Sequence, residues 1–186
     1  DECITLSVGF RAPTTDDLLT GFTDFLCSET PVDGHLPDLN PELPDNPGEI
    51  QPQVLEQLRS LIVDQIDNPR QLALWFGQFS TAPKNADIVM PAEQPMQADE
   101  LKSWLASGAI LRWNEGSRFA YTGLEQQTAL FVDGDRYLLS GDARPLAQVL
   151  CAASRPDQQA LLALCADDTL AELLTVLHNQ GSVYFE

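Results

Sequence analysis

The stretch TALFVDGDRYLLS, residues 128–140, decides the fold class. Its first part, TALFV (128–132), and its last part, RYLLS (136–140), are both typical of strands. Asp133-Gly134 between them suits a tight turn that requires positive φ, so the stretch predicts an antiparallel hairpin. We interpret Asp133 and Asp135, on either side of the glycine, as turn residues and not as calcium ligands.

Further elements flank this hairpin on both sides. Upstream, ADELKSWLASG (98–108) predicts a short helix closed by Gly108, and strands are expected at 109–113 and 118–122 around the turn 114–116. Downstream, helical patterns cover 143–153, 157–165 and 168–179, and SVYFE (182–186) predicts a terminal strand. Together these elements predict a compact α+β unit over residues 97–186, similar to a winged helix-turn-helix.

The N-terminal part is predicted to be helical. Thr14 or Thr15 can cap a helix that runs to about residue 28, with Asp16 and Asp17 in its first turn. Its apolar stripe consists of Leu18, Leu19, Phe22, Phe25 and Leu26.

Two more helices are expected before the linker. Residues 53–67 have apolar residues at helical spacing, and Asn68-Pro69 starts a further helix that ends near 82–83. The apolar face of this last helix consists of Leu72, Trp75, Phe76 and Phe79. Three such helices predict a small bundle, whose stripes serve either as an intramolecular core or as a dimer surface.

Proline-rich segments separate these parts. PVDGHLPDLNPELPDNPGEIQP (31–52) contains six prolines and predicts an extended, acidic connector, in which His35 is a solvated loop residue. Residues 83–96 form a second, shorter linker.

The chain begins with a predicted strand. Between Cys3 and Phe10, apolar residues alternate with Thr5, Ser7 and Gly9, the pattern of a half-buried strand. A single strand cannot satisfy its own backbone groups, so this one requires a partner.

The charge is strongly acidic, with 28 Asp and Glu against 10 Lys and Arg, for a net charge of -18. Neither half of the chain has an excess of basic residues that could neutralise phosphates, which disfavours nucleic-acid binding. The candidate recognition helix, DQQALLALC (157–165), contains no Lys or Arg. A basic protein partner fits this charge, although acidity can equally serve solubility.

No apolar run is long enough for a membrane span, and the cysteine pattern is typical of the reducing cytoplasm. Cys3, Cys27, Cys151 and Cys165 are far apart, without CxxC or Cys/His ligand spacing, and the last three are predicted to be buried free thiols. Zinc binding is not expected, because the two histidines, His35 and His178, have no ligand partner nearby in the sequence.

The sequence does not contain a recognisable catalytic motif. HxD, HExxH, GxSxG and glycine-rich phosphate loops are all absent. We interpret His178, beside Leu174 and Leu177 near a helix C-terminus, as a structural residue. No catalytic, cofactor-binding or metal-binding residue is therefore assigned in this chain.

Three segments resemble the bacterial ribosomal oxygenases. These segments are SVGFRAPTTDDLLTGFTDFL (7–26), LWFGQFSTAPKN (74–85) and the closing GSVYFE (181–186). That family consists of JmjC-type, cupin-fold enzymes that use Fe(II) and 2-oxoglutarate to hydroxylate an arginine of a large-subunit ribosomal protein. The resemblance covers essentially the whole chain, apart from the Pro-rich insert 31–52.

The resemblance implies a division into parts. Residues 1–13 would be the last strand of a cupin barrel whose iron-binding motif lies upstream, so that no iron or 2-oxoglutarate ligand falls within this chain. The resemblance would place Thr5 or Ser7 at the cofactor pocket, but ordinary strand alternation explains them better. Residues 14–82 would form a helical dimerisation region, 83–96 a linker and 97–186 a winged-helix domain.

Two functions follow as expectations. The first is the C-terminal portion of a ribosomal-protein arginine hydroxylase, which forms a homodimer, supports a basic substrate and is inactive by itself. The second is a complete, non-enzymatic acidic adaptor with a winged-helix module, in which strand 3–10 pairs within its own fold.

Overall fold

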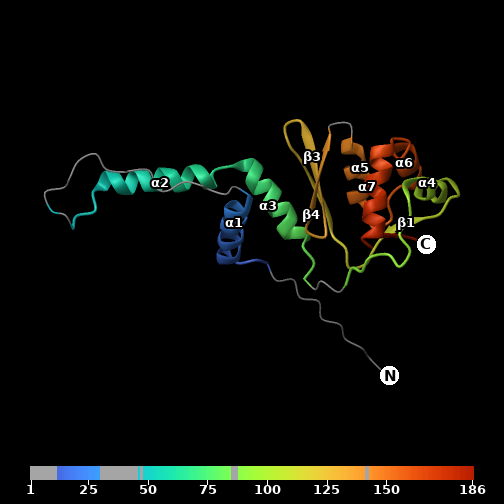
Figure 1. Ribbon diagram of the computed structural model, residues 1–186, viewed down its shortest axis with the longest axis horizontal. Helices are drawn as coiled ribbons and strands as arrows, with labels where there is room; N and C mark the ends of the chain where they lie inside the picture. Colours follow the sequence, from blue (N-terminus) through green and yellow to red (C-terminus); the bar gives the residue numbers. More distant parts are fainter. Residues whose placement is uncertain (1–11, 30–45, 47, 85–87, 141–142) are drawn as a thin grey trace, which may run out of the picture. The chain divides into compact units, whose positions relative to one another are not determined.

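The computed structural model describes residues 12–29, 46, 48–84, 88–140 and 143–186 (Figure 1). The predicted opening strand with Cys3, Thr5 and Ser7 lies outside the described residues, as does His35 with most of the Pro-rich insert. Contacts within the chain divide it into two units, residues 1–69 and residues 70–186.

The first unit contains helix α1 (Thr15–Glu29) and helix α2 (Pro52–Ile66). Thr14 caps α1, because its Oγ1 accepts a hydrogen bond from the Asp17 backbone N–H at 3.1 Å. The Asp17 carboxylate in return accepts from the Thr14 backbone N–H at 2.9 Å, so the two residues form a reciprocal capping box. The predicted start of this helix is thereby confirmed.

The second unit is built around a three-stranded antiparallel sheet in the order β2-β3-β4. Its strands are β2 (Phe119–Gly123), β3 (Gln127–Val132) and β4 (Asp135–Ser140). Asp133 and Gly134 connect β3 to β4 with φ of 52° and 90°, and Val132 lies opposite Asp135. Positive φ at both turn residues matches the right-handed twist of the strands, which confirms the predicted hairpin.

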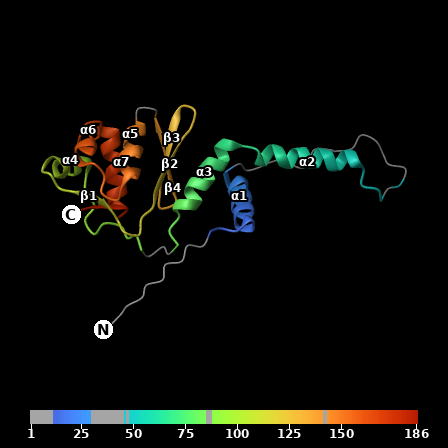
Figure 2. The same ribbon diagram turned by 180° about the vertical axis from the view of Figure 1, so that it is seen from behind.

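Helices cover both faces of this sheet. Figures 1 and 2 show α3 (Pro69–Thr81) on one side of the strands, and α5 (Arg144–Ala152) and α7 (Asp168–Asn179) on the other. The interior of β3 is accordingly buried at every position from Thr128 to Val132. On the α3 side, Phe131 lies directly against Gly77, where the helix has no side chain to hold it away.

The principal core lies between the sheet and the C-terminal helices. Leu130, Leu146, Leu150 and Leu174 are each 0% exposed there. Helix α4 (Ala98–Ala106) contributes Leu101 to the same core, and α6 (Gln158–Leu164) contributes Leu161. Burial of these leucines stabilises the unit by about 1.5–3 kcal/mol for each side chain.

Acidic caps begin α6 and α7. Asp157 Oδ1 accepts hydrogen bonds from Gln159 N and Ala160 N, at 2.9 and 3.2 Å. Asp167 Oδ1 accepts from Thr169 N at 2.8 Å in the same way. These two caps fix the helix starts that the sequence predicts.

One strand pairing differs from the expectation. The turn 114–116 suggested that β1 (Leu111–Trp113) and β2 form a hairpin, but β1 instead pairs antiparallel with the terminal β5 (Val183–Phe185). The turn redirects the chain from this two-stranded sheet to the three-stranded one, and Asn114 N donates to Ser182 O at 2.9 Å. A turn signal alone does not specify the strand that β1 pairs with.

The segment that leads into α4 is fastened to the end of α7. Asn179 accepts from Met96 N at 2.9 Å and donates to Met96 O at 3.0 Å, and its backbone carbonyl accepts from Ala92 N. Gly181, with φ of 87°, lies so close to Met90 O that an added Cβ would come within 1.8 Å of that oxygen. Residues 90–96 are therefore bound along the junction of α7 and β5.

Candidate functional site

The histidine and cysteine positions do not form a metal centre among the residues that the structure describes. No group of three or more His, Cys, Asp or Glu side chains able to hold a metal ion occurs in that part of the chain. His178 lies in α7, where its Nδ1 is 3.3 Å from Asn179 Oδ1 and its ring centre is 5.9 Å from that of Phe185. These neighbours are consistent with a structural role for His178.

The three described cysteines are free thiols with different exposure. Cys165 is buried, Cys151 is half-buried, and burial raises their pKa values to about 11 and about 12. Cys27 is exposed, so the expectation that it is buried is wrong. It lies five residues after the buried Phe22, about 140° around the helix, and thus away from the side of α1 that is covered.

The Asp133 carboxylate links three segments of the chain by hydrogen bonds. Its Oδ2 accepts hydrogen bonds from Ser117 Oγ at 2.8 Å and from Ser182 Oγ at 2.7 Å. Its Oδ1 accepts from Arg118 N at 2.8 Å. The carboxylate thus joins the β3–β4 turn to the loop before β2 and to the start of β5, which explains an aspartate at this position.

The candidate recognition helix, α6, is mainly apolar. Helix α6 spans seven residues, buries Leu161 and exposes Leu162 at 42%. It has no basic side chain for phosphate contacts.

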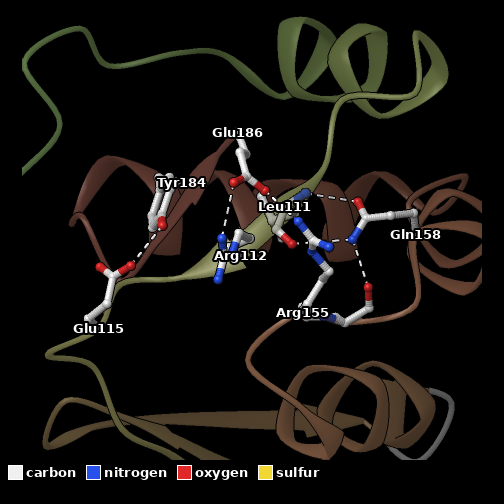
Figure 3. A network of polar contacts seen from close by, with 8 residues as sticks. Leu111, Arg112, Glu115, Arg155, Gln158, Tyr184 and Glu186 are labelled. Atoms are coloured by element: carbon white, nitrogen blue, oxygen red, sulfur yellow. Dashed lines mark hydrogen bonds and ion pairs between the residues drawn. The ribbon is translucent and has the colours of Figure 1, made fainter.

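A polar network holds the terminal strand in place (Figure 3). The Glu186 carboxylate accepts from Arg155 Nη2 at 2.6 Å and from Arg112 Nη1 at 3.1 Å. The hydrogen bond from Arg155, followed by the charges of both guanidinium groups, lowers the pKa of Glu186. At the other end of the strand, Tyr184 Oη donates to Glu115 Oε1 at 2.9 Å.

Gln158 extends this network to the backbone. Its Oε1 accepts from Leu111 N at 2.9 Å, and its Nε2 donates to Pro156 O at 2.7 Å and to Leu111 O at 3.3 Å. Figure 3 shows Gln158 beside Arg155, with both side chains directed toward β1. The network therefore joins β1 and β5 to the segment before α6, which is consistent with a structural role.

Helices α2 and α3 each expose apolar side chains. No residue of α2 is buried, and its exposed apolar residues are Leu55, Leu61, Ile62, Val63 and Ile66. On α3, Trp75 is buried at 7% exposure, whereas Leu72, Phe76 and Phe79 remain 46%, 50% and 37% exposed. Exposed apolar residues in such number are typical of surfaces that contact another protein.

A groove of about 550 Å³ runs between β4 and α7. Leu139, Ala143 and Leu170 are its most deeply buried lining residues, and Thr169 and Leu173 line its α7 side. The groove depends on the packing of two segments that are distant in the sequence, so no local pattern predicts it. Of the groups considered in the sequence that the structure describes, Asp133, Cys151, Cys165 and His178 do not line this groove.

No described helix is long and apolar enough to cross a membrane.

Comparison with known proteins finds a similarity to a ribosomal protein hydroxylase. Over 188 residues it is 26% identical to the ribosomal protein uL16 3-hydroxylase of Escherichia coli strain K12, and the match covers 100% of this chain and 48% of that protein. The chain therefore spans about half the length of the curated relative that it matches.

Solved structures give the same result. The crystal structure of the Escherichia coli ribosomal oxygenase YcfD matches with a TM-score of 0.80 and 25% identity, over 96% of this chain and 48% of that one. The structure of YcfD with cobalt and 2-oxoglutarate matches with a TM-score of 0.77 and 25% identity, over the same shares of the two chains. These matches confirm the resemblance and the α+β, winged-helix fold class. Because residues 64–184 also match the family described as the ROXA-like winged helix, the chain belongs to that family.

Proposed function

We propose that this chain is the C-terminal portion of an Fe(II)- and 2-oxoglutarate-dependent oxygenase that hydroxylates an arginine of a large-subunit ribosomal protein. The single observation that carries this proposal is the match of the entire chain to about half of the uL16 3-hydroxylase. Structures of the related oxygenase contain cobalt with 2-oxoglutarate or with succinic acid, which supports the same cosubstrate for the parent of this chain.

The described residues of this chain do not fit a metal-binding role. They contain no cluster of three His, Cys, Asp or Glu side chains around a common point. We therefore assign no step of the oxygenation to these residues, and propose that the metal and 2-oxoglutarate bind to another part of the parent protein. The chain alone is expected to be catalytically inactive.

The helical region, residues 14–82, is proposed to form a homodimer. Support comes from α2, on which five apolar residues are between 37% and 54% exposed. Leu55, Leu58, Ile62 and Ile66 recur at spacings that place them on one side of this helix. Burying them against a second copy removes apolar surface from water without any change of fold.

The winged-helix unit is proposed to support a basic ribosomal protein substrate in the cytoplasm. The net charge of -18 favours association with a basic protein and opposes association with DNA. The apolar α6, without Lys or Arg, provides independent support against a DNA-reading role.

The test uses the full-length protein that contains this sequence. We expect purified full-length protein with Fe(II), 2-oxoglutarate and the uL16 ribosomal protein to add one oxygen atom to an arginine, as detected by peptide mass spectrometry. The chain of residues 1–186, assayed in parallel, should give no succinate. A full-length protein that binds the ribosomal protein without turnover would overturn the proposal in favour of the acidic adaptor.

A further inference from the structure

Among the residues that the structure describes, strand β4 is an edge of the three-stranded sheet, without a further strand paired to it. Gln127 O accepts a hydrogen bond from Leu124 N at 2.8 Å, so the backbone of Gln127 is directed toward β2. Ser140 lies opposite Gln127 in the register, and its backbone groups consequently point away from β3. Because the direction of the backbone groups alternates along a strand, the N–H and C=O of Leu138 also point away from β3.

This edge lacks the protection that edge strands usually have. Natural edges are blocked by proline, by a bulge or by a charged side chain in the middle of the strand. The middle of β4 instead contains Leu138, whose side chain is 45% exposed, and its pairing with β3 is regular from Asp135 to Ser140. An exposed and regular edge of this kind can accept an additional strand.

The groove between β4 and α7 lies directly beside this edge. Its volume of about 550 Å³ suffices for several side chains, and Leu139, Ala143 and Leu170 provide an apolar base. Leu173 and Thr169 form a wall on α7. A strand added to β4 would place alternate side chains over this groove.

The elements that border the groove are mainly acidic. Asp167 lines it, Asp135 begins β4, and Glu172 is exposed on α7. Among the described lining residues, Arg136 is the single basic one. The local charge agrees with the net charge of -18, and both favour a segment with basic side chains.

We infer that the β4–α7 groove binds an extended basic segment of the protein substrate, which joins the sheet as a fourth strand along β4. The backbone of Leu138 and Ser140 provides the hydrogen bonds of the new ladder. The side chains on one face of the segment enter the groove, and its Lys or Arg side chains are attracted by the negative charges of Asp135, Asp167 and Glu172. The class of partner rests on the proposed function, whereas the strand-addition geometry rests on β4 and α7 alone.

The test uses two peptides of equal charge. The first is the acetylated, amidated heptapeptide Lys-Val-Lys-Val-Lys-Val-Lys, and the second has proline in place of the central valine. With ¹⁵N-labelled chain of residues 1–186, we expect the first peptide to shift the amide signals of β4 and of the start of α7, with saturation near 1 mM. The second should bind at least about tenfold more weakly, because proline lacks the central N–H of the ladder.

Paired variants of the chain locate the binding site. Leu138→Pro removes an outward N–H and blocks strand addition without removing a β3–β4 bond, whereas Leu138→Thr retains that N–H. We expect about a tenfold loss of affinity for Leu138→Pro and less than about a twofold change for Leu138→Thr. Thr169→Trp, at an exposed position, fills the groove and should weaken binding even if Leu138→Pro fails to fold.

Equal binding of the two peptides, or unchanged binding by Thr169→Trp, would overturn the inference in favour of charge attraction alone. Absence of any shift in β4 up to several millimolar peptide would also overturn it. These outcomes leave the hydroxylation assay of the full-length protein unaffected, so that failure of the groove and failure of the proposed function remain distinguishable.

Discussion

Gly77 on α3 faces the Phe131 ring so closely that a Cβ added to Gly77 would come within 2.2 Å of Phe131 Cε2. Glycine inside a helix costs about 1 kcal/mol relative to alanine, so an uncrowded Gly77→Ala would be stabilising. Here the added methyl group must displace a ring that is 1% exposed, which overpacks the contact between helix and sheet. We expect Gly77→Ala to lower the free energy of unfolding by about 1–3 kcal/mol in urea titrations.

A double-mutant cycle with Phe131→Leu tests the cause of this loss. Leucine is smaller and vacates part of the space, so the two substitutions together should cost less than the sum of their separate effects. Ser80→Ala, at an exposed position of the same helix, is the matched control and should change stability by less than about 0.5 kcal/mol. Additive effects of Gly77→Ala and Phe131→Leu would contradict the proposed contact.

The hydrogen bonds of the Asp133 carboxylate give a second prediction. Asn tolerates the positive φ of this position but cannot offer two acceptor oxygens to Ser117, Ser182 and Arg118. Asp133→Asn should therefore cost about 1–3 kcal/mol of unfolding free energy, because it leaves a buried hydroxyl without its acceptor. Asp135→Asn, at the exposed neighbouring position, should be nearly neutral. Equal effects of the two substitutions on the free energy of unfolding would argue against a stabilising role for the Asp133 hydrogen bonds.

Thiol ionisation gives a prediction for alkaline pH. The folded pKa values of Cys151 and Cys165 are about 12 and about 11, whereas an unfolded cysteine titrates near 8.5. Above about pH 8.5 the unfolded chain releases these protons first, so stability is full below that pH and falls as the pH rises toward the folded values. We expect the free energy of unfolding to decline between about pH 8.5 and 10.

The Cys151→Ala/Cys165→Ala variant is the control for this decline, and its pH slope should be smaller than that of the unaltered chain. The same pKa values predict slow labelling of both thiols at neutral pH, while the exposed Cys27 reacts rapidly. In a Cys3→Ser background, Ellman's reagent should detect one fast thiol, and its loss in Cys27→Ser assigns it. Two or more fast thiols in the folded chain would contradict this assignment.

The network of ion pairs around Glu186 should contribute to local order more than to global stability. Exposed ion pairs contribute little free energy, so Glu186→Gln should shift the unfolding midpoint only slightly. The Glu186 pKa is lowered by Arg155 and Arg112, so the interaction is present above the unfolded carboxyl value and is lost as pH falls through the folded one. Hydrogen exchange of β5 amides should therefore accelerate on acidification in the unaltered chain, and be already fast in the variant.

The proposed dimer depends on one side of α2. Leu55→Ser and Ile62→Ser each remove an exposed apolar side chain, and should shift residues 1–186 toward the monomer in light scattering across a concentration series. Gln57→Ser, on another side of the same helix, is the matched control and should retain the dimer. A chain that is monomeric at all concentrations would contradict dimerisation through this region.

Local chemistry explains which features were predictable. Thr14, Asp157 and Asp167 cap their helices as expected, because a cap depends on residues within one turn. Asp133-Gly134 specified its hairpin for the same reason. The pairing of β1 with β5 and the contact of Gly77 with Phe131 join residues that are far apart in sequence, and no local pattern encodes them. The groove beside β4 could not be predicted for that same reason.

For the apolar residues of the helices, the sequence predicted which residues share a side but not which of them are buried. Periodicity identified the apolar residues of α3 correctly, but it could not divide them between the buried Trp75 and the exposed Phe76. That division depends on the position of the sheet relative to α3. In the same way, the exposure of Cys27 depends on what surrounds α1. Sequence periodicity thus describes the composition of a helix side and leaves its partner undetermined.

The fastening of Met96 and Ala92 by Asn179 has a mechanical consequence. Gln78 and Thr81 on α3 are also hydrogen-bonded to Gly134 at the hairpin turn. Helix α3 and residues 90–96 are therefore both attached to the unit that contains the three-stranded sheet. Because α3 is hydrogen-bonded to the β3–β4 turn at its C-terminal end, we expect the helix to move together with the three-stranded sheet.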